Sequence, residues 1–282
     1  MTTSPAPIIQ HRVAVDGERA LNVRERTGDG PPFLLVHGLA SNARLWDGVS
    51  AQLSAAGHRV VALDQRGHGL SDRAGNGYNY PAVTGDLVAL CHAMGLDRPV
   101  LVGQSWGGNV VIHAGALHPD AWRGIAAVDG GTISLGQNFA DPQTAWEALK
   151  PPPLSSQPPG AVRRMIGSSV RDWPDGALEA QMGNFEELDD GTVRPHLALA
   201  DHRQIVEEML ANDPAAVYGR ITVPVLLLPV RGGTSEWALT KEEGVRAALE
   251  ALPNGRVQWF EGAHDIHLQA PVEVAAALLT LV

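Results

Sequence analysis

A serine stands at the centre of residues 103–107, which read Gly-Gln-Ser-Trp-Gly. The apolar run 99–102 precedes this segment, and a helical pattern over 108–118 follows it. A serine at such a strand-to-helix turn sits on a tight, strained bend, so small residues must flank it and its hydroxyl projects above the sheet. The helix start adds a positive dipole end beside any negative charge that develops there. The pattern predicts Ser105 as a nucleophile; the alternative is a glycine-rich turn that only packs.

A serine nucleophile needs a base that takes its proton. Two histidines, His264 and His267, follow the last apolar run of the chain, at 256–260. Either imidazole has the proton affinity for this role. His264, Asp265 and His267 also invite a metal interpretation, but nothing elsewhere in the sequence completes a ligand set. We therefore expect no metal ion.

The elements that must position these residues are short, continuous apolar runs. They occur at residues 31–36, 58–63, 99–102, 124–128, 223–228 and 256–260. Continuous apolar strands are typical of a parallel sheet that is buried on both faces. Helical patterns lie between them, near residues 46–53, 83–94, 110–117 and 272–279, and Asp16-Gly17 between alternating runs indicates a hairpin. The sequence predicts an α/β fold with helices on both sides of a mostly parallel sheet.

One segment, residues 133–215, breaks the alternation because it contains no continuous apolar strand. It carries 13 acidic and 6 basic residues, together with Pro151-Pro-Pro153 and scattered apolar residues that need a surface to cover. We interpret it as a mostly helical cap inserted between two strands. The predicted core domain is then residues 1–132 and 216–282, and the alternative for the insertion is a loop region without a lid role.

Composition excludes several classes of function. The 282 residues carry a formal net charge of −10, which disfavours nucleic acid and anionic membranes as partners. One cysteine, Cys91, rules out a disulfide framework and a cysteine-based zinc site. No signal peptide and no membrane span is visible, so we expect a cytoplasmic protein. Its oligomeric state is not determined by the sequence, and a homodimer is left open.

Four segments together resemble the α/β-hydrolase superfamily. They are Val-His-Gly-Leu at 36–39, Asp-Gln-Arg-Gly-His-Gly-Leu-Ser-Asp at 64–72, residues 103–107, and Gly-Ala-His-Asp-Ile-His at 262–267. Their order is that of the family, and they span nearly the whole chain outside the predicted cap. The resemblance implies an α/β-hydrolase fold and says little about the substrate.

The resemblance also implies roles for individual residues. Ser105 is the nucleophile, and His264 is preferred over His267 as the base because it follows a small-residue turn. The backbone N–H groups of Leu39 and Trp106 form an oxyanion hole above Ser105. His37 and the loop 64–69 are structural residues beneath the site.

The triad acid has two candidates. Family members usually place it after the strand that follows the cap, where Glu236 is the only carboxylate nearby. A second family position is the end of the strand after the nucleophile helix, and Asp129 stands there. We favour Asp129 and keep Glu236 as the alternative.

These residues predict acyl transfer to water through an acyl-enzyme, with no metal or organic cofactor. Haloalkane dehalogenases and epoxide hydrolases of this fold need an aspartate nucleophile, so Ser105 argues against both. The apolar residues and acidic charge of the cap favour a neutral, moderately hydrophobic ester or lactone. The alternatives are a hydroxynitrile lyase, a C–C bond hydrolase, or a non-catalytic ligand receptor on the same fold.

Overall fold

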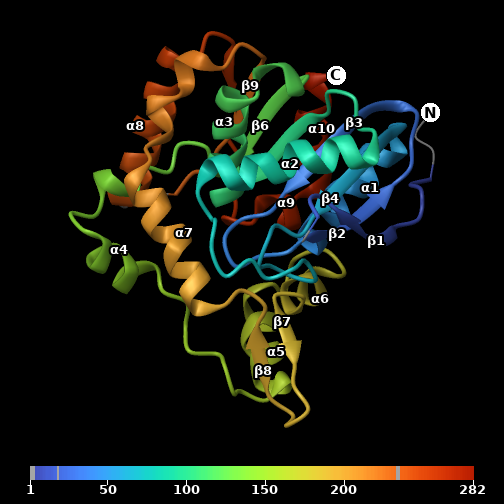
Figure 1. Cartoon of the computed structure of the whole chain (residues 1–282), viewed down its shortest axis with the longest axis vertical. Helices are drawn as coiled ribbons and strands as arrows, with labels where there is room; N and C mark the ends of the chain where they lie inside the picture. The colour runs from blue at the N-terminus through green and yellow to red at the C-terminus, as the bar shows by residue number, and fades with distance from the viewer. Residues whose placement is uncertain (1–3, 18, 233–235) are drawn as a thin grey trace.

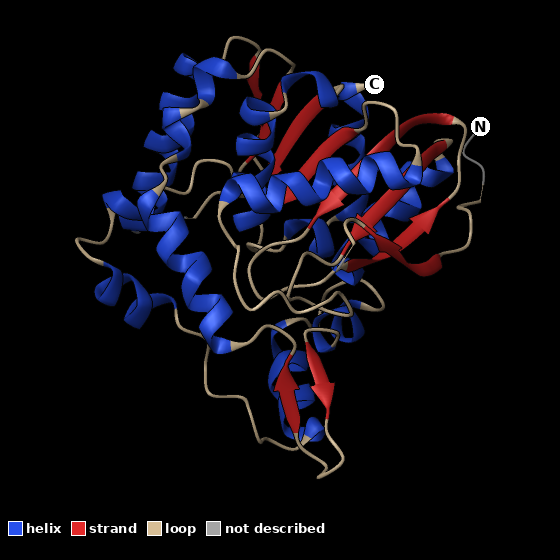
Figure 2. Ribbon diagram, in the orientation of Figure 1, coloured by secondary structure: helices blue, strands red, loops and turns tan. Residues whose placement is uncertain are grey.

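A twisted central sheet with helices on both faces forms the body of the protein (Figures 1 and 2). The computed structural model describes residues 4–17, 19–232 and 236–282, with the backbone alone at Glu236 and Trp237. Among these residues, no helix is both long and apolar enough to cross a bilayer. The α/β fold predicted from the sequence, with a mostly parallel sheet between helices, is confirmed.

The strands of the large sheet lie in the order β1-β2-β4-β3-β5-β6-β9-β10. Their bounds are β1 Ile9–Ala14, β2 Ala20–Arg26, β3 Gly30–Val36, β4 His58–Leu63, β5 Val100–Gln104, β6 Gly124–Val128, β9 Val225–Leu228 and β10 Gly255–Val257. β1 and β2 form the predicted antiparallel hairpin, and β2 pairs antiparallel with β4. All the other pairs of neighbours from β4 to β10 are parallel, so their carboxyl ends meet along one edge of the sheet.

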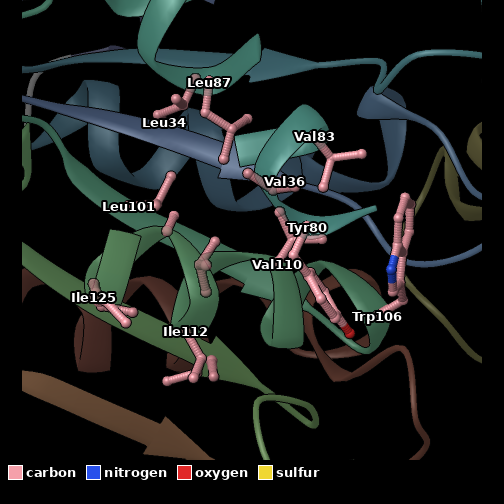
Figure 3. Close-up of a cluster of buried hydrophobic side chains, with 14 of the residues drawn as sticks. Leu34, Val36, Tyr80, Val83, Leu87, Leu101, Trp106, Val110, Ile112 and Ile125 are labelled. Carbon is pink, nitrogen blue, oxygen red and sulfur yellow. The ribbon is translucent and has the colours of Figure 1, made fainter. Parts of the chain in front are cut away.

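The two faces of the sheet are packed by alternate residues of the same strands. On β3, Leu34 and Val36 belong to one buried cluster, while Phe33 and Leu35 belong to the other. This period of two explains why the runs read as continuously apolar, because both faces must be covered. Figure 3 shows part of the first cluster, in which Leu34 lies near Leu87 of the covering helix.

Helices from different parts of the chain cover each face. Their bounds are α1 Asp47–Ala55, α2 Tyr80–Met94, α3 Trp106–Leu117, α8 Glu236–Ala251, α9 Ile266–Gln269 and α10 Pro271–Leu278. Side chains of α2, α3 and α8 enter the first cluster, and side chains of α1, α9 and α10 enter the second. The helical patterns in the sequence predict α1, α2, α3 and α10 but not α8, whose first residue is Glu236.

The segment predicted as a cap contains four helices and a small hairpin. Their bounds are α4 Pro142–Leu149, α5 Pro159–Ser169, α6 Ala177–Met182, β7 Phe185–Glu187, β8 Val193–Pro195 and α7 Leu199–Ala211. The antiparallel pair β7–β8 was not predicted. α4 packs against α7, whereas α5, α6 and the hairpin lie together at the lower end of the molecule in Figure 1.

Candidate active site

Ser105 follows the last residue of β5 and precedes the first residue of α3. Its backbone has φ +54° and ψ −122°, a region that costs an ordinary residue on the order of 1–3 kcal/mol. The turn leaves no space around it: a β-carbon on Gly103 would lie 2.0 Å from the carbonyl oxygen of Gly107, and one on Gly130 would lie 2.2 Å from that of Ser105. The glycines therefore let β5, α3 and the end of β6 approach closely enough to hold the serine in its strained position.

Asp129 and His264 meet beyond the carboxyl ends of β6 and β9. The Asp129 Oδ2 atom lies 2.6 Å from the His264 Nδ1 atom. The Asp129 side chain is 2% exposed, whereas that of His264 is 56% exposed, so the carboxylate lies behind an imidazole that faces the solvent. This contact places the Nδ1 proton of His264 against the carboxylate and leaves Nε2 for a second partner.

The electrostatics of the pair follow from burial and from mutual attraction. Desolvation lowers the pKa of His264, but the hydrogen bond and the charge of Asp129 outweigh it, so the net shift is upward. Desolvation raises the pKa of Asp129, but hydrogen bonds from His264, Lys241 and the backbone N–H of Val230 give a net lowering. The carboxylate is therefore ionised at neutral pH.

The two alternatives to this pair have different positions. The side chain of Glu236 lies outside the described residues. His267 is fully buried and packs against the ring of Trp46, with 4.3 Å between the ring centroids. Burial lowers its pKa to about 4, so it is a neutral core histidine.

The segment after β3 brings the backbone of Leu39 to the same cavity wall as Ser105 and Trp106. Within the described part of the chain, neither the Leu39 nor the Trp106 backbone N–H donates a hydrogen bond to another group. The next residue, Ala40, has φ +54° and donates its N–H to the Nε2 atom of His68 at 3.2 Å. Among the described residues, the Leu39 and Trp106 N–H groups are therefore without a hydrogen-bond acceptor at the wall of the cavity that holds Ser105.

Two buried histidines support this segment from below. His37 accepts the Gln65 N–H at its Nε2 atom and donates from Nδ1 to the Gly38 carbonyl, and His68 donates from Nδ1 to the Arg66 carbonyl. Burial lowers the pKa of His37 to about 4 and that of His68 to about 3, so both stay neutral. His37 does not line the cavity, consistent with a structural role.

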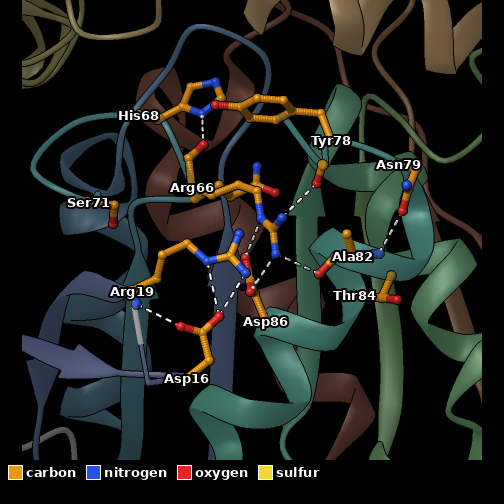
Figure 4. A network of polar contacts seen from close by, with 12 residues as sticks. Asp16, Arg19, Arg66, His68, Ser71, Tyr78, Asn79, Ala82, Thr84 and Asp86 are labelled. Carbon is orange, nitrogen blue, oxygen red and sulfur yellow. Dashed lines mark hydrogen bonds and ion pairs between the residues drawn. The ribbon is translucent and has the colours of Figure 1, made fainter. Parts of the chain in front are cut away.

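Arg66 anchors the loop 64–72 to helix α2. Its guanidinium makes a bidentate pair with the Asp86 carboxylate, at 2.6 and 2.7 Å, and also donates to the carbonyl of Ala82 (Figure 4). Both side chains of the pair are almost fully buried. Removing one partner would leave an uncompensated buried charge, which makes this pair a strong structural anchor.

A cavity of about 470 Å³ opens above the serine. Ser105, Asp129 and His264 line it together with the Leu39 and Trp106 segments. The rest of the wall has apolar and polar side chains. The apolar ones are Ile133, Leu135, Leu149, Met209, Pro229 and Ala238, and the uncharged polar ones are Thr132, Ser134, Asn138, His202 and Thr240. Among the described lining residues, Lys241 carries the positive charge, and it lies 2.7 Å from Asp129 Oδ1.

A family model for the alpha/beta hydrolase fold matches residues 31–187 of this sequence. The chain belongs to the α/β-hydrolase family.

Among curated α/β hydrolases and their relatives, the sequence is similar to 2-(acetamidomethylene)succinate hydrolase of Mesorhizobium japonicum. The two are 30% identical over 256 residues, which is 86% of each chain. A crystal structure of E-2-(acetamidomethylene)succinate hydrolase superimposes with a TM-score of 0.78, at 28% identity, over 98% of this chain and 99% of that one. Epoxide hydrolase B of Mycobacterium tuberculosis is 35% identical over 190 residues, which is 67% of this chain but only 51% of that relative. The relatives are hydrolases, and so is this member of the family.

Three polar residues at the α/β-hydrolase site were missed in the sequence. Lys241 contacts Asp129 from α8, and Gln104 donates from its amide to the His264 carbonyl at 3.2 Å and to Asp265 Oδ1 at 3.3 Å. Gln181, on α6, donates to the other oxygen of Asp265 at 2.8 Å. No motif marks Lys241 or Gln181, because their contacts depend on how distant segments pack. Gln104 directly precedes Ser105 within the motif at 103–107, so its position in the motif could have indicated a place in the site.

Proposed function

We propose that this α/β hydrolase cleaves a neutral, moderately hydrophobic carboxylic ester or lactone through an acyl-enzyme. One observation carries the proposal: the Asp129–His264 hydrogen bond of 2.6 Å lies in the same cavity as the strained Ser105 turn. The nucleophile Ser105 then follows β5, the base His264 lies in the loop after β10, and the acid Asp129 follows β6.

In the proposed reaction, Ser105 Oγ attacks the carbonyl carbon while His264 Nε2 takes the hydroxyl proton. The carbonyl oxygen becomes an oxyanion, and the Leu39 and Trp106 N–H groups stabilise it, with one such donor typically worth about 3–4 kcal/mol. The imidazolium then donates its proton to the leaving alkoxide. Water, deprotonated by His264, attacks the acyl-enzyme and releases the acid. The ionised Asp129 stabilises the imidazolium in both halves of the reaction.

The cavity wall supports a neutral substrate. Its apolar side chains favour an aliphatic or aromatic acyl group. Lys241, the cation among the described lining residues, is already paired with Asp129 and does not offer a full positive charge to a substrate carboxylate. A substrate with two carboxylates, such as the succinate in the name of the Mesorhizobium relative, would meet little compensating charge on the described wall.

Other chemistries on these residues are less well supported. Epoxide opening on this fold uses a carboxylate nucleophile, and the turn here carries Ser105. A hydroxynitrile lyase or a C–C bond hydrolase would need an additional polar side chain directly above the serine, and a receptor would need no turnover. Polar side chains do line the cavity, at Thr132, Ser134, Asn138, His202 and Thr240, and the substrate panel below tests ester hydrolysis directly.

The test combines a fluorophosphonate probe, which labels activated serines, with a panel of esters of varied acyl length and several lactones. We expect labelling and turnover of neutral substrates, and little turnover of 2-(acetamidomethylene)succinate. Ser105→Ala should lose labelling and lower kcat by at least about a thousandfold, because the nucleophile acts as part of a unit. Ser168→Ala, which changes an exposed serine on α5, is the matched control. Labelling that survives Ser105→Ala would refute the nucleophile assignment.

A further inference from the structure

Lys241 reaches the buried side of the acid–base pair from helix α8. Its Nζ atom lies 2.7 Å from Asp129 Oδ1 and 3.0 Å from the carbonyl oxygen of Val230. The N–H of Val230 donates to the same Oδ1 at 2.9 Å. Asp129 Oδ1 therefore has two donors, and Oδ2 is the oxygen that faces His264.

This arrangement determines which way the carboxylate is turned. A carboxylate on a side chain that is 2% exposed can still rotate about its last bond unless its oxygens are held differently. Lys241 and Val230 hold Oδ1 from the side of β9 and α8, which leaves Oδ2 in line with the Nδ1 proton of His264. The ammonium group is itself held by the Val230 carbonyl, so its position does not depend on a substrate.

Lys241 also affects the protonation of His264 through its charge. Among the described residues, the charged groups that act on this imidazole are Asp129 from the end of β6, Asp265 on its own loop, and Lys241 from α8. The buried His267 of α9 is coupled to the same ring, but burial keeps it neutral near pH 7. Both carboxylates favour the protonated ring, and Lys241 is the group whose positive charge opposes them. A base that is protonated at working pH cannot accept the proton of Ser105.

We propose that Lys241 is a positioning residue of the triad, which holds Asp129 towards His264 and offsets the negative charge that surrounds the imidazole. It acts through Asp129, and it need not touch the substrate. The kinetic consequences rest on the proposed function. The effect of Lys241 on the pKa of the imidazole does not depend on that function. The pKa and the kinetics are therefore measured separately.

The first measurement is an NMR titration of His264 in the whole protein. The protein has 11 histidines, and the signal that disappears in His264→Asn identifies the one from His264. In Lys241→Met the pKa of His264 should rise by about 0.5–1 unit, because a nearby positive charge is lost while the Val230 N–H still holds Asp129 Oδ1 and keeps the carboxylate near the ring. Lys241→Arg should restore most of the wild-type value. Lys241→Gln provides a second uncharged side chain if the methionine variant does not fold. Arg246→Met, which removes an exposed charge from the same helix, should leave the pKa unchanged.

The second measurement is kinetic, with the best neutral ester from the panel. In Lys241→Met, the pH at which kcat/KM falls on the acid side should rise by the same amount as the His264 pKa measured by NMR. Above that pH, kcat should still be lower by about tenfold or more while KM stays within about twofold, because a carboxylate that one donor holds instead of two aligns the imidazole less precisely, which affects the reaction and not binding. An unchanged or lowered pKa of His264 in both uncharged variants overturns the proposal. So does a raised KM with unchanged kcat, which would make Lys241 a substrate contact. If the fluorophosphonate probe fails to label Ser105, the proposed function fails, and the NMR titration still decides the role of Lys241.

Discussion

The carboxylate of Asp129 reaches His264 because two neighbouring strands end at the same place. β6 pairs with β9 in parallel, so the residues that follow Val128 and Leu228 lie side by side at one edge of the sheet. Asp129 has φ +39°, an uncommon conformation for a residue with a side chain, and this turn directs its carboxylate across the end of β9. The Val230 N–H then donates a hydrogen bond to Asp129 Oδ1 at 2.9 Å. In the proposed triad, the acid therefore comes from the end of β6 and not from the end of the neighbouring strand β9.

We expect Asp129→Asn to lower kcat by about three to four orders of magnitude. An amide in this position no longer carries the charge that stabilises the imidazolium, and its NH₂ group can turn the histidine to the wrong tautomer. Glu236→Gln should change kcat by only a small factor. The measurement is kcat for the best ester of the panel, with circular dichroism to confirm that each variant is folded. A severe loss of kcat in Glu236→Gln together with a mild loss in Asp129→Asn would show that Glu236, and not Asp129, is the acid of the triad.

At the scale of elements, the sequence predicts what is local and misses what depends on neighbours. The buried strands and the turn at Ser105 are recognisable because continuous apolar runs and small flanking residues are consequences of burial and close approach. Helix α8 was missed because two of its buried positions are alanines, Ala238 and Ala248, whose small side chains give a weak apolar signal among the charged residues of the same helix. The hairpin β7–β8 has three residues in each strand, too few for a recognisable alternation.

The same distinction holds within the site. Ser105, His264 and the two backbone donors belong to segments whose own residues mark them. The contact between Asp129 and His264 spans 135 positions in the chain, and that between Asp129 and Lys241 spans 112. Such contacts depend on strand order and on how α8 lies over the sheet edge, and a single sequence displays neither.

The inserted segment divides into a part that lines the cavity and a part that does not. Leu149 ends α4, and His202 and Met209 lie on α7; all three line the cavity. Helices α5 and α6 supply none of the described lining residues, and α6 instead packs over Leu45 and Leu268. The start of the insertion also lines the cavity, through Ile133, Ser134, Leu135 and Asn138. Acyl-group selectivity should therefore depend on residues 133–138, α4 and α7, and not on α5 or α6.

We expect Leu149→Ala to shift the preferred ester to a longer acyl chain, because it removes three carbon atoms from the wall of the cavity. The ratio of kcat/KM between the longer and the original best ester should change by about tenfold or more, which is the discrimination typical of one or two methylene groups. Met165→Ala on α5, a half-exposed residue outside the cavity, is the matched control and should leave the ranking unchanged. An unchanged ranking in Leu149→Ala, or an equal shift in both variants, would contradict this division of the insertion.

At the scale of the whole molecule, the fold keeps several histidines neutral in its interior. Burial lowers the pKa of His37, His113 and His267 to about 4 each, and that of His68 to about 3. Unfolding exposes these rings to water, where the pKa returns to about 6.5. Below that value the unfolded chain binds protons that the folded protein excludes, so the free energy of unfolding must fall as the pH drops from about 6.5 towards 4. His264 acts in the opposite direction, because its raised pKa adds stability at low pH that is lost as the pH rises through it.

His267 allows this contribution to be isolated. Its ring packs on Trp46, and neither ring nitrogen has a hydrogen-bond partner among the described residues, so a phenylalanine would keep the packing and lose no hydrogen bond. Urea unfolding of wild type and His267→Phe at pH 7, 6 and 5 should show a shallower pH dependence in the variant, by up to about 1.4 kcal/mol per pH unit for one excluded proton. His92→Gln removes an exposed histidine on α2 and should keep the wild-type slope. The variant His267→Phe should also retain ester turnover, since His264 is the proposed base. Equal slopes in His267→Phe and wild type would mean that this ring does not resist protonation in the folded protein.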